Sequence, residues 1–278
     1  MFAPVPVGQV QEMLHGRKGR QIRFSQFVLC TPNAQGAALR TILLPVNCEL
    51  KMIIAFDADD TLWPNQPHFD EVEAAFFNIL AHCGDPATLH PQLYAVPRRN
   101  MALYGYGAKA LTLSLIETAI QLTEGAVTSA DIQQLLNLGK DLLRFRIELL
   151  PGVAEVLPAL RLRGHHLMLL TKGDLFDQES KLARSGLGDL FDHVEVVSEK
   201  DEATYQRLFR RYQATPENFI MIGNSLKSDV LPVVRLGYRA IHVPYHATWI
   251  HEQVSEAELV GMQFQQITHL VEVLDYLP

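Results

Sequence analysis

Three aspartates lie within four positions of one another, directly after an apolar run. The run MIIAF, residues 52–56, leads into Asp57, Asp59 and Asp60. Carboxylates this close repel one another, and an apolar run of this kind is usually buried. The spacing therefore predicts a site at the end of a buried strand, where cations must balance the negative charge.

Polar residues also follow three other apolar runs, which read as strands over residues 166–171, 193–198 and 218–223. A further strand is expected over 239–244. Helical spacing separates these strands, over residues 154–164, 177–186, 201–212 and 228–237, and a last helix is expected over 267–277. This alternation predicts an α/β fold with a doubly wound, Rossmann-like parallel sheet covered by helices on both faces.

In such a sheet, ligands bind at the carboxyl ends of the strands. Taken singly, each polar residue there is more typical of a helix cap or a solvated charge. Because every strand end supplies at least one, we expect them to form one site around the aspartates. The candidates are Thr171, Lys172, Glu199, Lys200, Asn224, Ser225 and Asp229.

Residues between about 65 and 150 lack this alternation. Helical patterns over 70–84, 99–122 and 128–150 follow one another with no clear strand, and Thr128 or Ser129 is the expected N-cap of the last. We therefore expect an all-helical cap domain at 65–150, inserted into an α/β core made of 51–64 and 151–278.

Residues 1–50 form an N-terminal extension that carries no motif. They hold a net charge of +3, which leaves −10 for the remainder of a chain whose net charge is −7. The runs FSQFVLC and ALRTILLPV could form short strands. The segment is either a real accessory segment or sequence that precedes a start at Met52, and we expect the chain to fold without it.

Composition excludes several classes of protein. The 278 residues are 48% hydrophobic and 20% charged, as in globular proteins. A net charge of −7 argues against nucleic acid as a partner. No apolar run reaches the roughly 20 residues of a membrane helix, and the N-terminus lacks a signal-peptide core. Three cysteines are too few for a disulfide framework. These features favour a cytoplasmic protein without a membrane partner; they do not define an oligomeric state.

Four stretches, in order, resemble the four motifs of the haloacid dehalogenase superfamily: FDADDTLW, LLTKGD, SEKDEA and MIGNSLKSDV. The first, Asp-x-Asp-x-Thr after a buried strand, is the most specific of them. The resemblance covers residues 52–278 and implies a helical cap inserted after the first motif. It points to the phosphatase branch, which hydrolyses small phosphorylated metabolites with Mg²⁺ as cofactor.

The resemblance also implies residue roles. Asp57 is expected to be the nucleophile that forms an aspartyl-phosphate, and Asp59 the general acid and base. Thr171, Lys172 and Lys200 are expected to bind phosphate, Lys172 through its backbone N–H. The expected metal ligands are Asp57, the backbone carbonyl of Asp59, and Asp229. Asn224 departs from the acidic residue common at its position, so it is a weaker candidate ligand.

Three alternatives remain open. A phosphotransferase or mutase would use the same groups. A metal-free 2-haloacid dehalogenase would not need a proton donor at Asp59, although the Asn224–Ser225 pair favours it slightly. A non-enzymatic ligand-binding protein would not need the complete catalytic set. Specificity is expected to come from cap residues, and the stretch VPYHATWIHE, residues 243–252, has no assigned role. The candidate specificity residues are Trp63, His68, Arg98, Arg99, Tyr104, Tyr106 and Lys109.

Overall fold

The computed structural model describes residues 24–29, 40–45, 51–82, 86–247, 249 and 252–278. Contacts divide the chain into two compact units, Met1–Leu50 and Lys51–Pro278. In the first unit, β1 (Phe24–Leu29) and β2 (Arg40–Pro45) form an antiparallel pair, which confirms the two short strands expected there.

The second unit contains a six-stranded parallel sheet with the order β5-β4-β3-β6-β7-β8. The strands are β3 (Ile53–Phe56), β4 (His166–Lys172), β5 (His193–Val197), β6 (Phe219–Gly223), β7 (Arg239–His242) and β8 (Gln265–Gln266). β3 lies between β4 and β6, so both of its edges pair with a neighbouring strand. The predicted fold class is therefore confirmed, with β8 as an additional two-residue edge strand.

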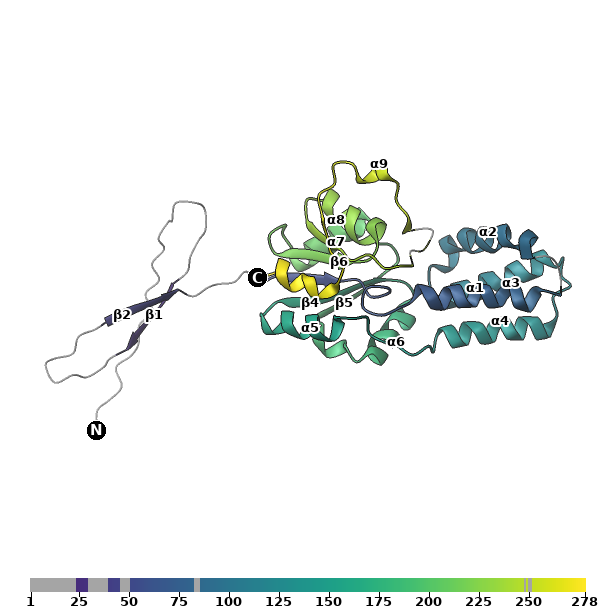
Figure 1. Ribbon diagram of the computed structural model, residues 1–278, viewed down its shortest axis with the longest axis horizontal. Helices are drawn as coiled ribbons and strands as arrows, with labels where there is room; N and C mark the ends of the chain where they lie inside the picture. The colour runs from purple at the N-terminus through teal and green to yellow at the C-terminus, as the bar shows by residue number, and fades with distance from the viewer. Residues whose placement is uncertain (1–23, 30–39, 46–50, 83–85, 248, 250–251) are drawn as a thin grey trace, which may run out of the picture. The chain divides into compact units, whose positions relative to one another are not determined.

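Helices cover both faces of this sheet (Figure 1). One face packs on α5 (Val153–Leu162), α6 (Leu175–Ser185) and the C-terminal α10 (Val273–Tyr276). The other packs on α7 (Glu202–Tyr212) and α8 (Leu231–Arg235). Both apolar clusters contain fully buried residues of β3, so the strand that precedes Asp57 is anchored from two sides.

Two predicted helices differ in detail. The last helix, expected over 267–277, is a 3₁₀ turn (Leu270–Glu272) followed by the single turn of α10. The helix expected over 228–237 begins as a π-helical turn (Leu226–Val230) before α8. Pro232 lies in the first turn of α8 and has no N–H to donate to the preceding turn. A short α9 (Glu256–Leu259) was not predicted.

The described residues of the range 66–142, which omit 83–85, contain four helices: α1 (Gln66–Leu80), α2 (Pro86–Tyr104), α3 (Ala108–Leu122) and α4 (Ser129–Leu142). Side chains of α1, α3 and α4 share an apolar cluster of their own, and Figure 1 shows the four helices grouped beside the sheet. Thr128 caps α4 through a capping box with Asp131, as expected. The structure describes no strand of the parallel sheet between residues 66 and 142.

The helical pattern expected over 99–122 is confirmed except at Gly105 and Gly107, which interrupt it between α2 and α3. Their φ angles are 70° and 101°, in the left-handed region that favours glycine. The chain thus turns between α2 and α3, and Tyr106 lies at the turn. The helix expected to reach residue 150 ends at Leu142, after which Leu150 donates its N–H to the carbonyl of Leu62.

We expect that a chain starting at Met52 will fold and keep its activity. The pairing of β1 is with β2, and no described strand of residues 1–50 joins the parallel sheet. The thermal midpoint of the shortened protein should lie within about 3 °C of the full chain, since about 1 kcal/mol corresponds to a few degrees in a domain this size. Insoluble or inactive protein would show that the extension stabilises the second unit.

Candidate active site

The carboxyl ends of four adjacent strands surround one cavity of about 200 Å³. β3 is followed by Asp57, β4 carries Thr171 and Lys172 at its end, Lys200 follows β5, and Asn224 follows β6. We call the group of helices α1–α4 (residues 66–142) the helical block; residues of its α1, α2 and α3 form the opposite wall of the cavity. The seven residues to which the resemblance gives a role all line this cavity: Asp57, Asp59, Thr171, Lys172, Lys200, Asn224 and Asp229. Of the other strand-end candidates, Ser225 lines the cavity and Glu199 does not.

Lys200 is the cation that allows Asp57 to lie beside a second carboxylate. Its ammonium donates to Asp57 and, at 2.7 Å, to Oδ1 of Asp229. All three residues are buried. Burial raises the pKa of Asp57 to about 7, although Lys200 opposes this shift and Asp229 adds to it. Asp57 and Asp229 in turn raise the pKa of Lys200 against the effect of its burial, so Lys200 is protonated.

Asn224 and Thr61 complete the surroundings of Asp57. The hydroxyl of Thr61 donates to Oδ2 of Asp57 at 3.1 Å and accepts the N–H of Asn224 at 3.0 Å. The side-chain nitrogen of Asn224 donates to Oδ2 of Asp57 at 3.2 Å and to the carbonyl oxygen of Asp59 at 3.3 Å.

Converging oxygens are a donor set that a hard cation can neutralise. Mg²⁺ takes few carboxylates and keeps several waters, so the carboxylate of Asp57 and the carbonyl of Asp59 fit it. The amide of Asn224 lies beside both oxygens, and Asp229 lines the same cavity. Among the described residues, no group of three His, Cys, Asp or Glu side chains is placed to hold a metal. A carbonyl and an amide are therefore needed beside the carboxylates.

Three side chains hold the carboxylate of Asp59. Trp63 donates its indole N–H to Oδ1 at 2.8 Å, Gln178 donates to Oδ2 at 2.8 Å, and Lys181 lies 3.0 Å from Oδ2 and 3.1 Å from Oδ1. Gln178 and Lys181 were not predicted. They are three positions apart on α6, so one face of that helix presents both to the site.

Asp60 has a structural role. It accepts the backbone N–H groups of Asn65 at 2.8 Å and Gln66 at 3.1 Å, where α1 begins. Burial raises its pKa to about 7, and these two N–H groups oppose the shift. The φ angle of Asp60 is 62°, a conformation that aspartate tolerates better than most residues.

Few of the candidate specificity residues line the cavity. Arg98 and Tyr106 do so. Trp63 is buried against Asp59, Arg99 pairs with Glu117, and Lys109 pairs with Asp174 at 2.8 Å. His68 stacks on Phe145 at 4.1 Å between ring centroids, and Tyr104 is 47% exposed. The sequence pattern could not show which of these side chains line the cavity, because that depends on how each segment is oriented in the folded chain.

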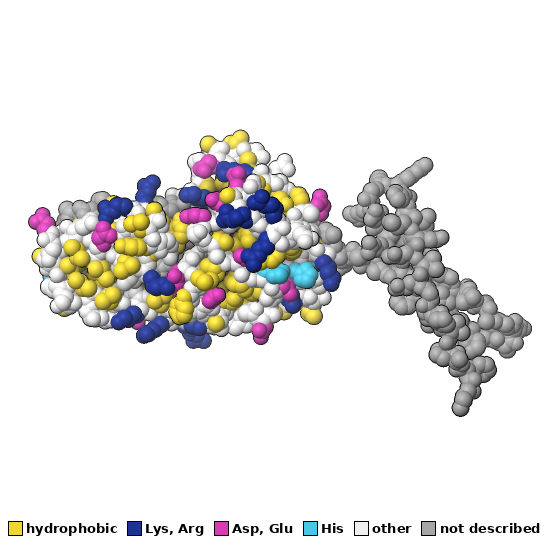
Figure 2. All heavy atoms as spheres, turned by 180° about the vertical axis from the view of Figure 1, so that it is seen from behind, with side chains coloured by type: hydrophobic (Ala, Val, Ile, Leu, Met, Phe, Trp, Pro, Cys, Tyr) yellow, Lys and Arg dark blue, Asp and Glu magenta, His cyan; other side chains and the backbone are white. Residues whose placement is uncertain are grey.

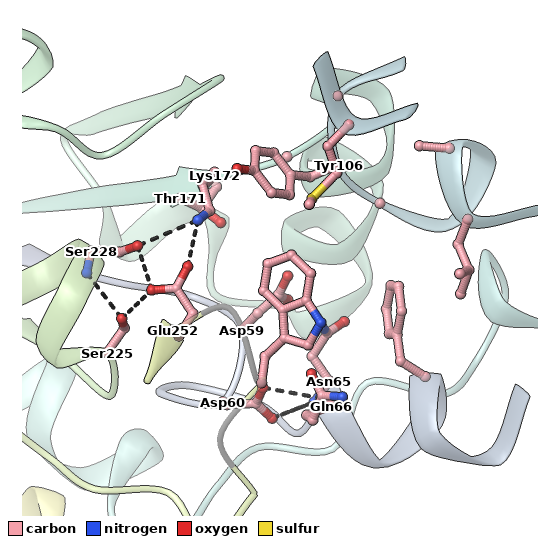
Figure 3. Close-up of a pocket in the computed structure, with 18 of the residues that line it drawn as sticks. Asp59, Asp60, Asn65, Gln66, Tyr106, Thr171, Lys172, Ser225, Ser228 and Glu252 are labelled. Carbon is pink, nitrogen blue, oxygen red and sulfur yellow. Dashed lines mark hydrogen bonds and ion pairs between the residues drawn. The ribbon is translucent and has the colours of Figure 1, made fainter. Parts of the chain in front are cut away.

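The rim of the cavity includes a carboxylate that sequence reasoning missed. Glu252 accepts from the ammonium of Lys172 at 2.5 Å and from the hydroxyls of Ser225 and Ser228 (Figure 3). The same ammonium lies 4.5 Å from the centroid of the Tyr106 ring. Glu252 belongs to the stretch VPYHATWIHE, whose unusual composition was the only signal for it.

Comparison with known proteins agrees with the geometry. Residues 51–237 match the family of haloacid dehalogenase-like hydrolases. The chain belongs to this family. The predicted class of enzyme, a haloacid dehalogenase-like hydrolase, is thus confirmed, and so is the resemblance stated from the four motifs.

Several relatives resemble this hydrolase over most of its length. A haloacid dehalogenase-like family hydrolase from Xanthomonas campestris is 43% identical, with a TM-score of 0.68 over 73% of this chain and 85% of that one. A glyceraldehyde 3-phosphate phosphatase from Methanothermobacter thermautotrophicus is 24% identical over 80% of this chain and 98% of the relative. The HAD-hydrolase YfnB from Bacillus subtilis, solved with bound magnesium, has the same fold, with 16% identity and a TM-score of 0.58.

Basic and acidic side chains both occur on the face drawn in Figure 2. No helix among the described residues is long and apolar enough to span a membrane.

Proposed function

We propose that this hydrolase is a Mg²⁺-dependent phosphatase that cleaves small phosphorylated metabolites through an aspartyl-phosphate on Asp57. The observation that carries the proposal is that Asp57 and Asp59, which follow β3, line one cavity with Thr171 of β4 and with Lys200, which follows β5. This set provides a nucleophile, an acid–base group, a cation and a hydroxyl donor, which are the parts that phosphoryl transfer requires.

In the first step, a carboxylate oxygen of Asp57 attacks phosphorus and the bond from phosphorus to the leaving oxygen breaks. Asp59 donates a proton to that oxygen, so the alcohol leaves neutral. Lys200 and the Thr171 hydroxyl bind the phosphate oxygens, together with the N–H of Lys172. In the second step, Asp59 takes a proton from water, and the water oxygen attacks phosphorus. The bond from phosphorus to the Asp57 oxygen breaks, which releases inorganic phosphate and restores the carboxylate of Asp57.

Mg²⁺ would supply charge neutralisation of the phosphate oxygens and of Asp57. Asp57, the carbonyl of Asp59, Asp229 and Asn224 would hold it. Because Asn224 is neutral, it contributes less charge to the metal than an acidic residue would.

The presence of Asp59 in the cavity favours phosphatase activity over the dehalogenase alternative. Displacement of halide from carbon needs no proton donor, yet this chain has a second carboxyl group, Asp59, in the same cavity as Asp57. Three curated relatives, one matching 80% of this chain and two matching smaller parts of it, are glyceraldehyde 3-phosphate phosphatases. A small phosphorylated substrate suits a cavity of about 200 Å³.

We further propose that residues 65–150 act as a cap over a core made of 51–64 and 151–278. Tyr106 and Lys109, at the turn and start of α3, contact Glu199 and Asp174 of the core. These contacts would close the cavity and exclude water during the reaction. The composition of the chain and its three cysteines support a cytoplasmic location.

A panel of phosphate esters assayed with and without Mg²⁺ tests the function. The panel should include p-nitrophenyl phosphate, glyceraldehyde 3-phosphate and short sugar phosphates. We expect release of inorganic phosphate that EDTA abolishes and added Mg²⁺ restores. Hydrolysis that persists after metal removal, or halide release from 2-haloacids without phosphate release from any ester, would refute the proposal.

A further inference from the structure

Glu252 occupies a group of donors that would suit a carboxylate from outside the chain. Its Oε2 accepts from the Ser228 hydroxyl at 2.6 Å and from the Ser225 hydroxyl, and its Oε1 accepts from the Lys172 ammonium at 2.5 Å (Figure 3). Two hydroxyls and an ammonium directed at one carboxylate form a strong anion-binding arrangement. We call these three donors, from Lys172, Ser225 and Ser228, the rim cradle.

The carboxylate in the rim cradle is ionised and largely shielded from water. The side chains of Glu252 and Lys172 are only 13% and 14% exposed. Burial by itself would raise the pKa of Glu252, but Lys172 and the two serine hydroxyls lower it below its ordinary value. Screening by solvent is weak at such a position, so this negative charge acts strongly on its neighbours.

The rim cradle belongs to the cavity that contains Asp57 and Asp59. A substrate whose phosphate lies at Asp57 must place its leaving group in the same cavity, between the strand ends and the helical block. A leaving group that carries a carboxylate would therefore approach an anion site that Glu252 already occupies. The negative charge of Glu252 would repel it, and Lys172 is already paired with Glu252.

The other cations of the cavity do not compensate. Lys181 pairs with Asp59, and Lys200 pairs with Asp57 and Asp229. Arg98 lines the cavity but is exposed, so its attraction for a carboxylate is screened by water. Like charges placed against an unwanted ligand are a common source of specificity.

We propose that Glu252 is a specificity-determining residue that disfavours phosphate esters with a carboxylate on the leaving group and so selects esters with an uncharged, hydroxylated leaving group. This inference rests on the proposed phosphatase function and names the substrate class of the same site. Glu252 also determines the position of Lys172, because the two serine hydroxyls anchor the carboxylate that holds the ammonium above Tyr106.

The test compares two esters of equal length, glycerol 3-phosphate and 3-phosphoglycerate, which differ by a hydroxymethyl group in place of a carboxylate. The quantity measured is the ratio of kcat/KM for 3-phosphoglycerate to kcat/KM for glycerol 3-phosphate, with Mg²⁺ present. We expect a ratio below about 0.1 for the native chain. Glu252→Gln should raise it at least about tenfold, because Lys172 and the serines then become available to the substrate carboxylate.

Two controls separate this effect from a general change in charge. Glu252→Asp keeps the negative charge and should keep the ratio low. Glu199→Gln removes another carboxylate near Lys172, 3.9 Å away but 52% exposed, and should leave the ratio within about twofold of the native value. If Glu252→Gln does not fold, Lys172→Met tests the same arrangement. This substitution leaves Glu252 without its cation, so the ratio of kcat/KM values should fall further instead of rising.

A native preference for 3-phosphoglycerate, or a ratio that Glu252→Gln leaves within twofold, would overturn the inference while the phosphatase function stands. Failure of the native chain to hydrolyse either ester and p-nitrophenyl phosphate would instead refute the proposed function, and the inference with it.

Discussion

Asp57→Asn is expected to abolish phosphate ester hydrolysis, with a loss of kcat on the order of 10⁴-fold or more, the scale on which loss of a covalent nucleophile acts in other enzymes. Asparagine has nearly the same shape and can still accept from Lys200 and Thr61, which now contact the carboxylate. It lacks the anionic oxygen that attacks phosphorus. The loss should therefore appear with every ester, whatever its leaving group.

Trapping of the phosphoenzyme provides the second readout for Asp57. Native protein quenched in acid during turnover should retain a phosphoryl group that hydroxylamine releases, and Asp57→Asn should retain none. Asp189→Asn, at an exposed position in the 3₁₀ turn after α6, is the matched control and should behave as the native chain. The thermal midpoint of Asp57→Asn should not fall substantially, because the substitution removes a buried carboxylate whose pKa burial has raised. Undiminished hydrolysis by a folded Asp57→Asn variant would refute the proposed mechanism.

Asp59→Asn is expected to lower kcat/KM for an alkyl phosphate by about 10²–10⁴-fold, the usual contribution of general acid catalysis. For p-nitrophenyl phosphate the loss in kcat/KM should be much smaller, since nitrophenolate leaves with little protonation. The comparison uses kcat/KM because this quantity reports the steps up to the first phosphoryl transfer. Attack by water on the aspartyl-phosphate comes later and needs Asp59 as a base for both esters, so kcat should fall for both.

The contacts of Asp59 require a structural control. Its substitution also removes the negative charge that pairs with Lys181, and Lys181 would keep Asp177 at 3.8 Å as its remaining carboxylate partner among the described ion pairs. Asp177→Asn disturbs the same lysine without removing the proposed acid. It should lower kcat/KM for the two esters by similar factors. Equal losses for the two esters in Asp59→Asn would refute its role as general acid.

Much of the site was predictable because it depends on where buried strands end. Four apolar runs each ended at a polar residue, and parallel strands direct those ends to one edge of the sheet. The structure accordingly brings Asp57, Thr171, Lys200 and Asn224 around one cavity. Their roles in phosphoryl transfer remain predictions.

The helical content of the helical block was predictable from the sequence, but the position of the turn between α2 and α3 was not. Helical periodicity continues through residues 99–122, yet the chain turns at Gly105 and Gly107, where positive φ angles are adopted. Nothing in the apolar pattern marks this turn, since two glycines alone are also tolerated within helices. Only the packed structure shows that Tyr106 at this turn contacts Glu199, far away in the sequence.

The sequence by itself determined the fold class, the motif residues and the strand ends that carry them, because these follow from local patterns. The tertiary structure decided which charges meet. Asp59 meets Lys181 across 122 positions, and Lys172 meets Glu252 across 80. Such pairs depend on the rotation of α6 and the path of the chain after β7, which are set by packing over the whole sheet. The acid–base environment and the charge at the cavity rim are therefore properties of the folded chain.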